Sequence, residues 1–250
     1  MKRLLAGDSR VSEPQASRTF ATLAGLSLMA ACSAVEVDPF AVPVDRLSET
    51  QRGKVEHVLA DVAAAVPLEA AEVKSSLEVY DFLLTEMPFT GGVVRELGRG
   101  KWDIFRDPKN PERDVFHVID PDGFRLRFEL VLREETRRVY VTKGTFLMGL
   151  LPALEGTTVI VMRMFPSGGV LRTDAVVYVR VETPFYRELA KGFRGLVEQK
   201  VRDRAGYFIR AAKWVAEEAR ERPEWLYTQV AGSKEVDQAV LEEFRKKFLR

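Results

Sequence analysis

The sequence predicts an α+β domain in which a curved antiparallel sheet of six or seven strands wraps around a long C-terminal helix. Two short helical patterns come first, six strand-like segments follow, and a long stretch of helical periodicity comes last. Strands joined by short turns pair antiparallel. With 250 residues and 46% hydrophobic side chains, the chain can form one sizeable core.

Two helices are expected before the strands. The first begins at the N-cap residue Ser48 and ends before Pro67, and the second runs from about Glu69 to Glu86 and ends at Pro88 and the Gly91–Gly92 pair. Apolar residues recur at helical spacing in both, namely Val55, Val58, Leu59, Val62 and Val66 in the first and Val73, Leu77, Tyr80, Leu83 and Leu84 in the second.

Six strand candidates follow, with turns rich in Gly, Pro and Asp between them. They begin near Val93, Asp114, Phe124, Arg137, Thr157 and Val170, and an apolar connector, residues 146–156, lies between the fourth and fifth. The clearest is residues 124–133, where one face carries Phe124, Leu126, Phe128, Leu130 and Leu132 and the other is mostly charged. One face of the sheet is therefore expected to be buried and the other wet.

The last long element is a helix. Pro184 suits its first turn and no proline follows until Pro223, so about 35 residues are available for it. Gly192 and Gly195 inside it indicate either the close approach of another element or a ligand, or simple tolerance at a surface. Its inner stripe is Leu189, Phe193, Leu196, Val197, Val201, Phe208, Ala212 and Val215.

Residues 223–250 are expected to form a C-terminal helical extension. Residues 224–232 have no regular pattern, and Ser233 is a candidate N-cap for the amphipathic segment that follows. Its apolar side carries Val236, Val240, Phe244 and Phe248, which suits packing on the domain or on a protein partner.

The N-terminus is typical of an export signal. Residues 20–31 form an uncharged apolar run after Arg18, which is too short to span a bilayer but long enough for a signal peptide. It ends in Met29-Ala30-Ala31-Cys32, which resembles the bacterial lipobox, whose cysteine is diacylated and becomes the mature N-terminus. Against this interpretation, the preceding segment is long and acidic at Asp8 and Glu13; the alternative is a disordered arm followed by a buried helix with a core cysteine.

On the lipobox interpretation, residues 1–31 are a signal peptide and residues 32–46 are a linker that also offers an edge strand. The mature protein is then exported and lipid-anchored to a membrane, facing the periplasm. Ser33, in place of Asp after the cysteine, resembles a signal for sorting to the outer membrane.

Composition argues against several functions. The formal net charge of +1 shows no bias toward nucleic acid. One cysteine and two histidines leave no disulfide framework and little for a metal centre, and no nucleophile elbow, phosphate loop or zinc-protease motif occurs. We therefore expect no cofactor, no metal and no nucleic-acid partner.

Residues 47–222 resemble the helix-grip superfamily, which includes START lipid-transfer domains, polyketide cyclases and plant pathogenesis-related class 10 proteins. The resemblance lies in the order of elements, in Leu97-Gly98-Arg99-Gly100-Lys101-Trp102 entering the first strand of the run and in Thr183-Pro184-Phe185 opening the last helix. It implies a cavity between the concave face of the sheet and the helix, which members use for sterols, phospholipids, polyketides or other apolar molecules.

Eleven residues are candidates for lining such a cavity, and the same residues would form an ordinary core if no cavity exists. They are Trp102, Leu126, Phe128, Leu130, Val159, Val161, Val177, Val179, Phe193, Leu196 and Phe208.

Three functions compete at this stage. The leading hypothesis is an envelope lipoprotein that carries or transfers an apolar molecule, most simply a lipid, without catalytic residues. The second is a cyclase-like or aromatase-like enzyme in which Asp103 or His117 acts inside the cavity; Asp174 is a third strand residue of this kind, while Glu129 falls on the wet face. The third is an interaction protein with a filled core, whose C-terminal helix docks a partner of the envelope.

Overall fold

The computed structural model describes residues 40–109, 114–121, 123–146 and 154–249. The fold described below is that of the compact unit Asp38–Arg250. The predicted signal peptide, Cys32, most of the linker and most of the apolar connector therefore lie outside the described residues.

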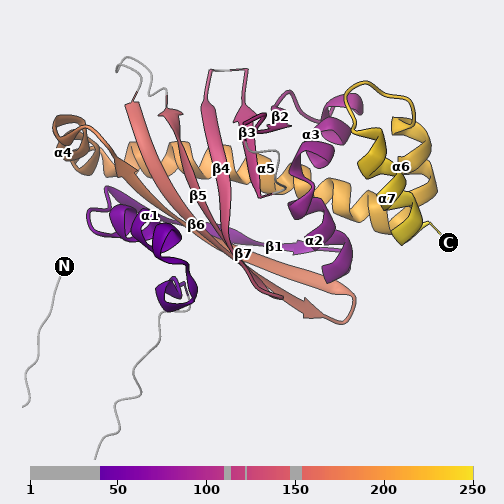
Figure 1. Cartoon of the computed structure of the whole chain (residues 1–250), viewed down its shortest axis with the longest axis horizontal. Coiled ribbons are helices and arrows are strands. Elements are labelled where there is room, and N and C mark those ends of the chain that lie inside the picture. Colours follow the sequence, from indigo (N-terminus) through magenta and orange to yellow (C-terminus); the bar gives the residue numbers. More distant parts are fainter. Residues whose placement is uncertain (1–39, 110–113, 122, 147–153, 250) are drawn as a thin grey trace, which may run out of the picture. The chain divides into compact units, whose positions relative to one another are not determined.

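Seven strands form one antiparallel sheet in the order β1-β7-β6-β5-β4-β3-β2. Their bounds are Ala64–Val73, Asp103–Arg106, Val115–Ile119, Arg125–Arg133, Arg137–Phe146, Leu154–Ser167 and Val170–Val181 for β1 to β7. The long helix α5 (Arg194–Glu221) crosses one face of this sheet (Figure 1). The predicted fold class, a curved antiparallel sheet around a long C-terminal helix, is confirmed.

The seventh strand is β1, and its position was predicted wrongly. Residues 64–66 were expected to end the first helix and residues 69–73 to begin the second, but β1 pairs along β7 with Ala64 opposite Val179. Pro67 is tolerated because β1 is an edge strand and one side of its backbone needs no partner. An edge strand was also predicted in the linker, residues 32–46. In the described part of this linker there is no strand, and Val44–Arg46 form the short helix η1.

Helix α1 (Glu49–Leu59) confirms the first predicted helix, although it ends earlier than expected. Ser48 caps it in a capping box with Gln51. Its buried residues Val55 and Val58 pack with Val139, Val159 and Val161 on the face of the sheet that is turned away from α5. This second core explains why both faces of the middle strands are apolar.

Two helices stand where one helix and the start of a strand were predicted. Helix α2 (Leu77–Thr85) is followed directly by α3 (Met87–Glu96), so Pro88 lies in the first turn of a helix and does not end one. An added Cβ on Gly92 would collide with the backbone oxygen of Glu235, so this glycine allows α3 to approach the C-terminal segment. The first strand after these helices begins only at Asp103.

The predicted 35-residue helix is broken into α4 (Pro184–Gly192) and α5. The break is at Phe193, whose backbone has φ −105° and ψ 32°. An added Cβ on Gly192 or Gly195 would have no heavy atom within 4 Å, so of the two interpretations of these glycines, surface tolerance is the correct one.

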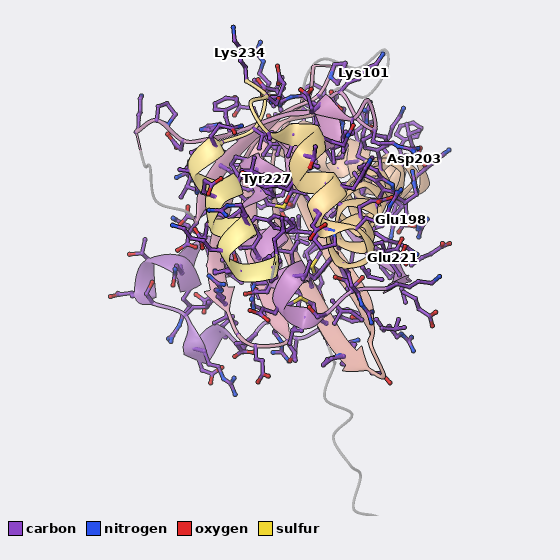
Figure 2. All side chains as sticks on the ribbon, turned by 90° about the vertical axis from the view of Figure 1, so that its right-hand side faces the viewer. Lys101, Glu198, Asp203, Glu221, Tyr227 and Lys234 are labelled. Carbon is purple, nitrogen blue, oxygen red and sulfur yellow. The ribbon has the colours of Figure 1, made fainter. Side chains whose placement is uncertain are left out.

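The C-terminal segment packs on the domain itself. Residues 223–230, predicted to be irregular, form α6, and α7 (Gln238–Phe248) is capped by Asp237 and not by Ser233. Tyr227 of α6 donates a hydrogen bond to Glu242 of α7 (2.7 Å), and Figure 2 views the domain from this end. Phe244 is fully buried and lies 5.9 Å from Phe89 of α3 between ring centroids.

The larger core lies between the sheet and the helices α2, α3, α5, α6 and α7. Strand β4 contributes to both cores because its pairing with β5 shifts between Leu130 and Leu132. Leu130 therefore lies in the larger core, whereas Leu132 packs against the smaller one, so the predicted single apolar face of this strand holds only up to Leu130. In the part of the chain that the structure describes, no helix is long and apolar enough to cross a membrane.

Candidate ligand-binding cavity

A cavity of about 170 Å³ lies within the larger core, between the sheet and α5. Its walls come from every strand except β2, from α2 and α3, and from the first half of α5. The helix contributes Val197, Val201, Ala205, Phe208 and Ile209. Most of the lining side chains are apolar.

The sheet wall consists of side chains in register across neighbouring strands. Phe116, Phe128, Thr142, Thr158 and Val179 are successive partners from β3 to β7, and all five line the cavity. Residues paired across an antiparallel sheet point to the same face. Once the pairing of the strands is known, one lining residue in one strand therefore identifies the lining residues of its neighbours.

Aromatic rings form one wall. Phe116 and Phe128 stack with centroids 5.0 Å apart, and Phe208 of α5 lies 6.4 Å from Phe128 with its ring nearly parallel. Trp102, just before β2, also stacks on Phe208, with ring centroids 5.3 Å apart. Tyr140 contacts Phe128 edge-on at 6.4 Å, and complete burial holds the pKa of its phenol well above the usual value.

Two buried hydroxyls interrupt the apolar sheet wall. The Oγ1 atoms of Thr142 and Thr158 lie 2.7 Å apart, so one hydroxyl donates to the other. A hydroxyl has one proton and two lone pairs, so this bond leaves one proton and further acceptor capacity in the pair. The pair can therefore hydrogen-bond a polar atom of a molecule in the cavity.

Charged side chains border the cavity where β3 turns into β4. The Asp120 carboxylate is almost completely buried, accepts a hydrogen bond from the Phe124 backbone N–H (3.0 Å) and pairs with the Arg204 guanidinium (2.6 Å). The same guanidinium lies over the Phe124 ring, 4.8 Å from its centroid. Lys200, one helical turn before Arg204, also lines the cavity and is exposed to solvent.

The structure places the predicted lining residues in three groups. Those that do line the cavity are Trp102, Leu126, Phe128, Val177, Val179 and Phe208. Leu130 is buried in the larger core but outside the cavity wall. The remaining four, Val159, Val161, Phe193 and Leu196, do not line it.

Val159 and Val161 lie on the opposite face of β6, in the smaller core beneath α1. Their neighbours Thr158, Ile160 and Met162 line the cavity in their place. The alternation of β6 could not be read from the sequence because both faces of this strand are covered by apolar cores.

Phe193 and Leu196 are 57% and 43% exposed, so they are not part of the cavity wall. The helix break at Phe193 changes the direction of the chain, and the helical stripe counted through this point does not continue from α4 to α5.

None of the strand residues considered for catalysis, including Glu129, which was expected on the wet face, lines the cavity. Asp103 is exposed and pairs with Arg95 (2.7 Å), and Asp174 pairs with Arg163 (2.7 Å). His117 lies 3.4 Å from Asp107 and stacks on Phe105, on the other side of β3 from Phe116 and Val118. Glu129 lies on the α1 side, where it accepts hydrogen bonds from Lys54 (2.6 Å) and Arg127 (3.0 Å).

Sequence reasoning missed the polar residues of the cavity, namely Asp120, Thr142, Thr158, Lys200 and Arg204. Phe128 pairs with Thr142, which in turn pairs with Thr158, so the predicted lining residue Phe128 would have led to both threonines. This step requires the pairing register of β4, β5 and β6, which the sequence does not give. Among the described residues, no group of three or more His, Cys, Asp or Glu side chains is placed to hold a metal ion.

The order of elements, the long helix across one face of the sheet and the cavity between them define this domain as a helix-grip fold with an apolar cavity. No family model and no curated protein matches the chain.

Several solved structures are similar over about three fifths of the chain. Norcoclaurine synthase from Thalictrum flavum, solved in complex with dopamine and hydroxybenzaldehyde, is 12% identical with a TM-score of 0.41, and the match covers 63% of this chain and 88% of that one. Protein NE0264 from Nitrosomonas europaea is 16% identical with a TM-score of 0.39, over 63% of this chain and 97% of that one. Ara h 8.0201 is 11% identical with a TM-score of 0.39, over 61% and 97%. Similarity at this level carries no argument about ligand or reaction.

Proposed function

We propose that the domain binds a small apolar molecule in its cavity and acts as a carrier or store for it. The observation that carries this proposal is the cavity of about 170 Å³ between the sheet and α5, whose walls are mostly apolar. Pockets for small molecules in other proteins are likewise mostly apolar, with a few polar groups that orient the ligand.

The energetics favour an occupant. An unfilled cavity costs roughly 24 cal/mol per Å³ in lost packing, which amounts to about 4 kcal/mol for a cavity of this size. An apolar cavity of about 150 Å³ in another protein stays free of water and binds benzene. A ligand that fits would recover much of this cost, and only the folded domain would bind it.

The size of the cavity limits the ligand. At the packing density of protein interiors, about 0.75, it holds roughly 125 Å³ of atoms. A molecule with a single ring or a short chain fits this volume, whereas a phospholipid with two acyl chains does not. We therefore narrow the expected lipid to a compact apolar molecule.

The competing functions have less support. The enzyme hypothesis required Asp103 or His117 in the cavity, and both lie outside its lining. The interaction hypothesis required a filled core and a C-terminal helix free for a partner, yet the apolar side of α7 packs in its own domain through Val240, Leu241 and Phe244.

We also propose that the mature protein is held at the periplasmic side of the outer membrane by lipid attached to Cys32. The sequence before Cys32 supports this through its apolar run and lipobox-like ending, and Cys32 is the single cysteine of the chain. A lipid anchor would keep a soluble carrier at the surface from which apolar molecules are taken up or to which they are delivered.

The ligand proposal is tested with the full chain carrying Cys32→Ala, purified without detergent. Organic extraction followed by mass spectrometry identifies any co-purifying molecule, and thermal unfolding with added hexan-1-ol measures binding to the emptied protein. We expect hexan-1-ol to raise Tm, because a ligand that binds only the folded state stabilises it.

Cavity-filling variants show where binding occurs. Ala205→Phe adds a ring to the cavity wall from α5, and Ala175→Leu adds volume from β7. We expect either variant to abolish the Tm increase without lowering Tm itself, whereas Ala239→Phe on the exposed start of α7 keeps the increase. No Tm increase in the unfilled protein, or an increase that survives both filling variants, would contradict the proposal.

A further inference from the structure

The charged groups of the cavity lie together, and this gives the cavity a polar end. Asp120 follows β3, whereas Lys200 and Arg204 are four residues apart and therefore on one side of α5. Arg180 also borders the cavity, but its guanidinium donates to the His57 carbonyl (2.9 Å) on the α1 side of the sheet. The wall of stacked rings at Phe116, Phe128 and Phe208 carries no charge.

The charges at this end do not cancel. Asp120 and Arg204 form an ion pair at 2.6 Å, and the carboxylate is only 3% exposed. Within the described part of the chain, Lys200 takes part in no hydrogen bond or ion pair. Among the described residues that line this end, two cations therefore stand against one carboxylate, an excess of one positive charge.

Acidic residues nearby on α5 do not neutralise Lys200. Glu198 pairs with Arg194 (2.7 Å) and is 3.9 Å from Arg202. Asp203 is exposed, and Figure 2 shows it with Glu198 and Glu221 on the outer side of the helix, away from the sheet. An ammonium group beside an apolar cavity attracts an anion and repels a cation.

We propose that the ligand is a small monocarboxylate with an apolar body, bound with its carboxylate at Lys200 and its body against the aromatic wall. This inference rests on the proposed function, because it names the class of ligand for the same cavity. One carboxylate matches the single excess charge and stays hydrated at the exposed lysine, so its binding does not require complete desolvation.

The test compares three probes that share one chain and differ in charge: hexanoate, hexan-1-ol and hexylamine. Binding to the full chain carrying Cys32→Ala is measured by calorimetry at low and high salt. We expect hexanoate to bind about three- to tenfold more tightly than hexan-1-ol, and hexylamine to bind more weakly than either. Salt should reduce the preference for hexanoate, because the lysine is exposed and its field is screened.

Two variants identify the lysine. Lys200→Gln should remove the preference for hexanoate while hexan-1-ol binding stays unchanged, and Lys200→Glu should make hexylamine the better ligand. Lys213→Glu is the matched control, since Lys213 lies on the same helix and does not line the cavity; it should behave as the parent protein.

The two proposals fail differently. Equal binding of all three probes, or a preference that Lys200→Glu leaves unchanged, would overturn the carboxylate inference and leave the apolar cavity as the binding site. If no probe binds at all, both the inference and the proposed function are wrong.

Discussion

At the scale of single residues, a few polar side chains distinguish the cavity from an ordinary core. Thr142 and Thr158 form a hydroxyl pair in the sheet wall, and Asp120, Arg204 and Lys200 border one end. Pockets for small molecules in other proteins carry a few such polar groups on mostly apolar walls, so these residues fit the proposed role in orienting a ligand.

On the face of the sheet that carries α1, the ionised side chain of Glu129 contributes to the stability of the fold. Burial raises the pKa of the Glu129 carboxyl, but hydrogen bonds from Lys54 and Arg127 outweigh it, so the pKa lies below its usual value of 4.5. A carboxyl whose pKa is lowered by folding stabilises the folded state when it is ionised.

We predict that Glu129→Gln lowers the free energy of unfolding by about 1 kcal/mol at pH 7, because the two partners are partly exposed. This contribution is present above the unfolded pKa of 4.5 and is lost as the pH falls through the lower folded pKa. Urea unfolding of both proteins between pH 7 and about pH 3 measures it.

The control for this prediction is Glu188→Gln, whose side chain is 72% exposed. It should change stability by less than about 0.5 kcal/mol at any pH. A Glu129→Gln effect of constant size down to about pH 3 would show that ionisation of this carboxyl is not its cause.

At the scale of elements, the glycines of the helices have different roles. Gly92 in α3 lies against the backbone of Glu235, just before α7, and a side chain there would collide with it. Gly195 in the first turn of α5 has open space where its side chain would be. From the sequence alone, Gly92 was expected at the end of a helix and Gly195 inside one, and the close contact at Gly92 could not be foreseen.

We predict that Gly92→Ala destabilises the domain by about 1–3 kcal/mol, because backbone atoms cannot move aside as a flexible side chain can. Gly195→Ala should stabilise it by about 0.4–1 kcal/mol, since it reduces the freedom of the unfolded chain without a steric cost. Thermal and urea unfolding of both variants check this pair; a loss of stability in Gly195→Ala would mean that another group occupies the space beside it.

At the scale of the whole molecule, the proposed anchor and the proposed carrier are separate parts of the chain. Cys32 precedes the described residues, whereas the cavity is lined by residues between Leu68 and Ile209. Removal of the anchor should therefore change where the protein is found without changing ligand binding.

We predict that Cys32→Ala abolishes acylation and moves the protein from the detergent phase to the aqueous phase in detergent partitioning. The reason is that each CH₂ of an acyl chain buried in the bilayer contributes about 0.8 kcal/mol to membrane binding, and the variant carries no acyl chain. Ser33→Ala should remain in the detergent phase, and an unchanged distribution of Cys32→Ala would rule out the lipobox interpretation.

The sequence by itself determined the class of the fold. The alternation in residues 125–130, the short turns between the later strands and the proline-free stretch after Pro184 are local signals, and they were sufficient for the type of each element, although not for the break in the last helix. The N-cap Ser48 belongs to the same group, because a helix cap depends only on neighbouring residues.

Only the tertiary structure decided β1, the helix break at Phe193 and the members of the cavity wall. Residues 64–73 become a strand because β7 supplies their partners, and the lining face of β6 is set by its register with β5 and β7. Apolar residues satisfy a packed core, a second core beneath α1 and a cavity equally well. The choice among these depends on contacts between residues far apart in the chain, which local periodicity does not contain.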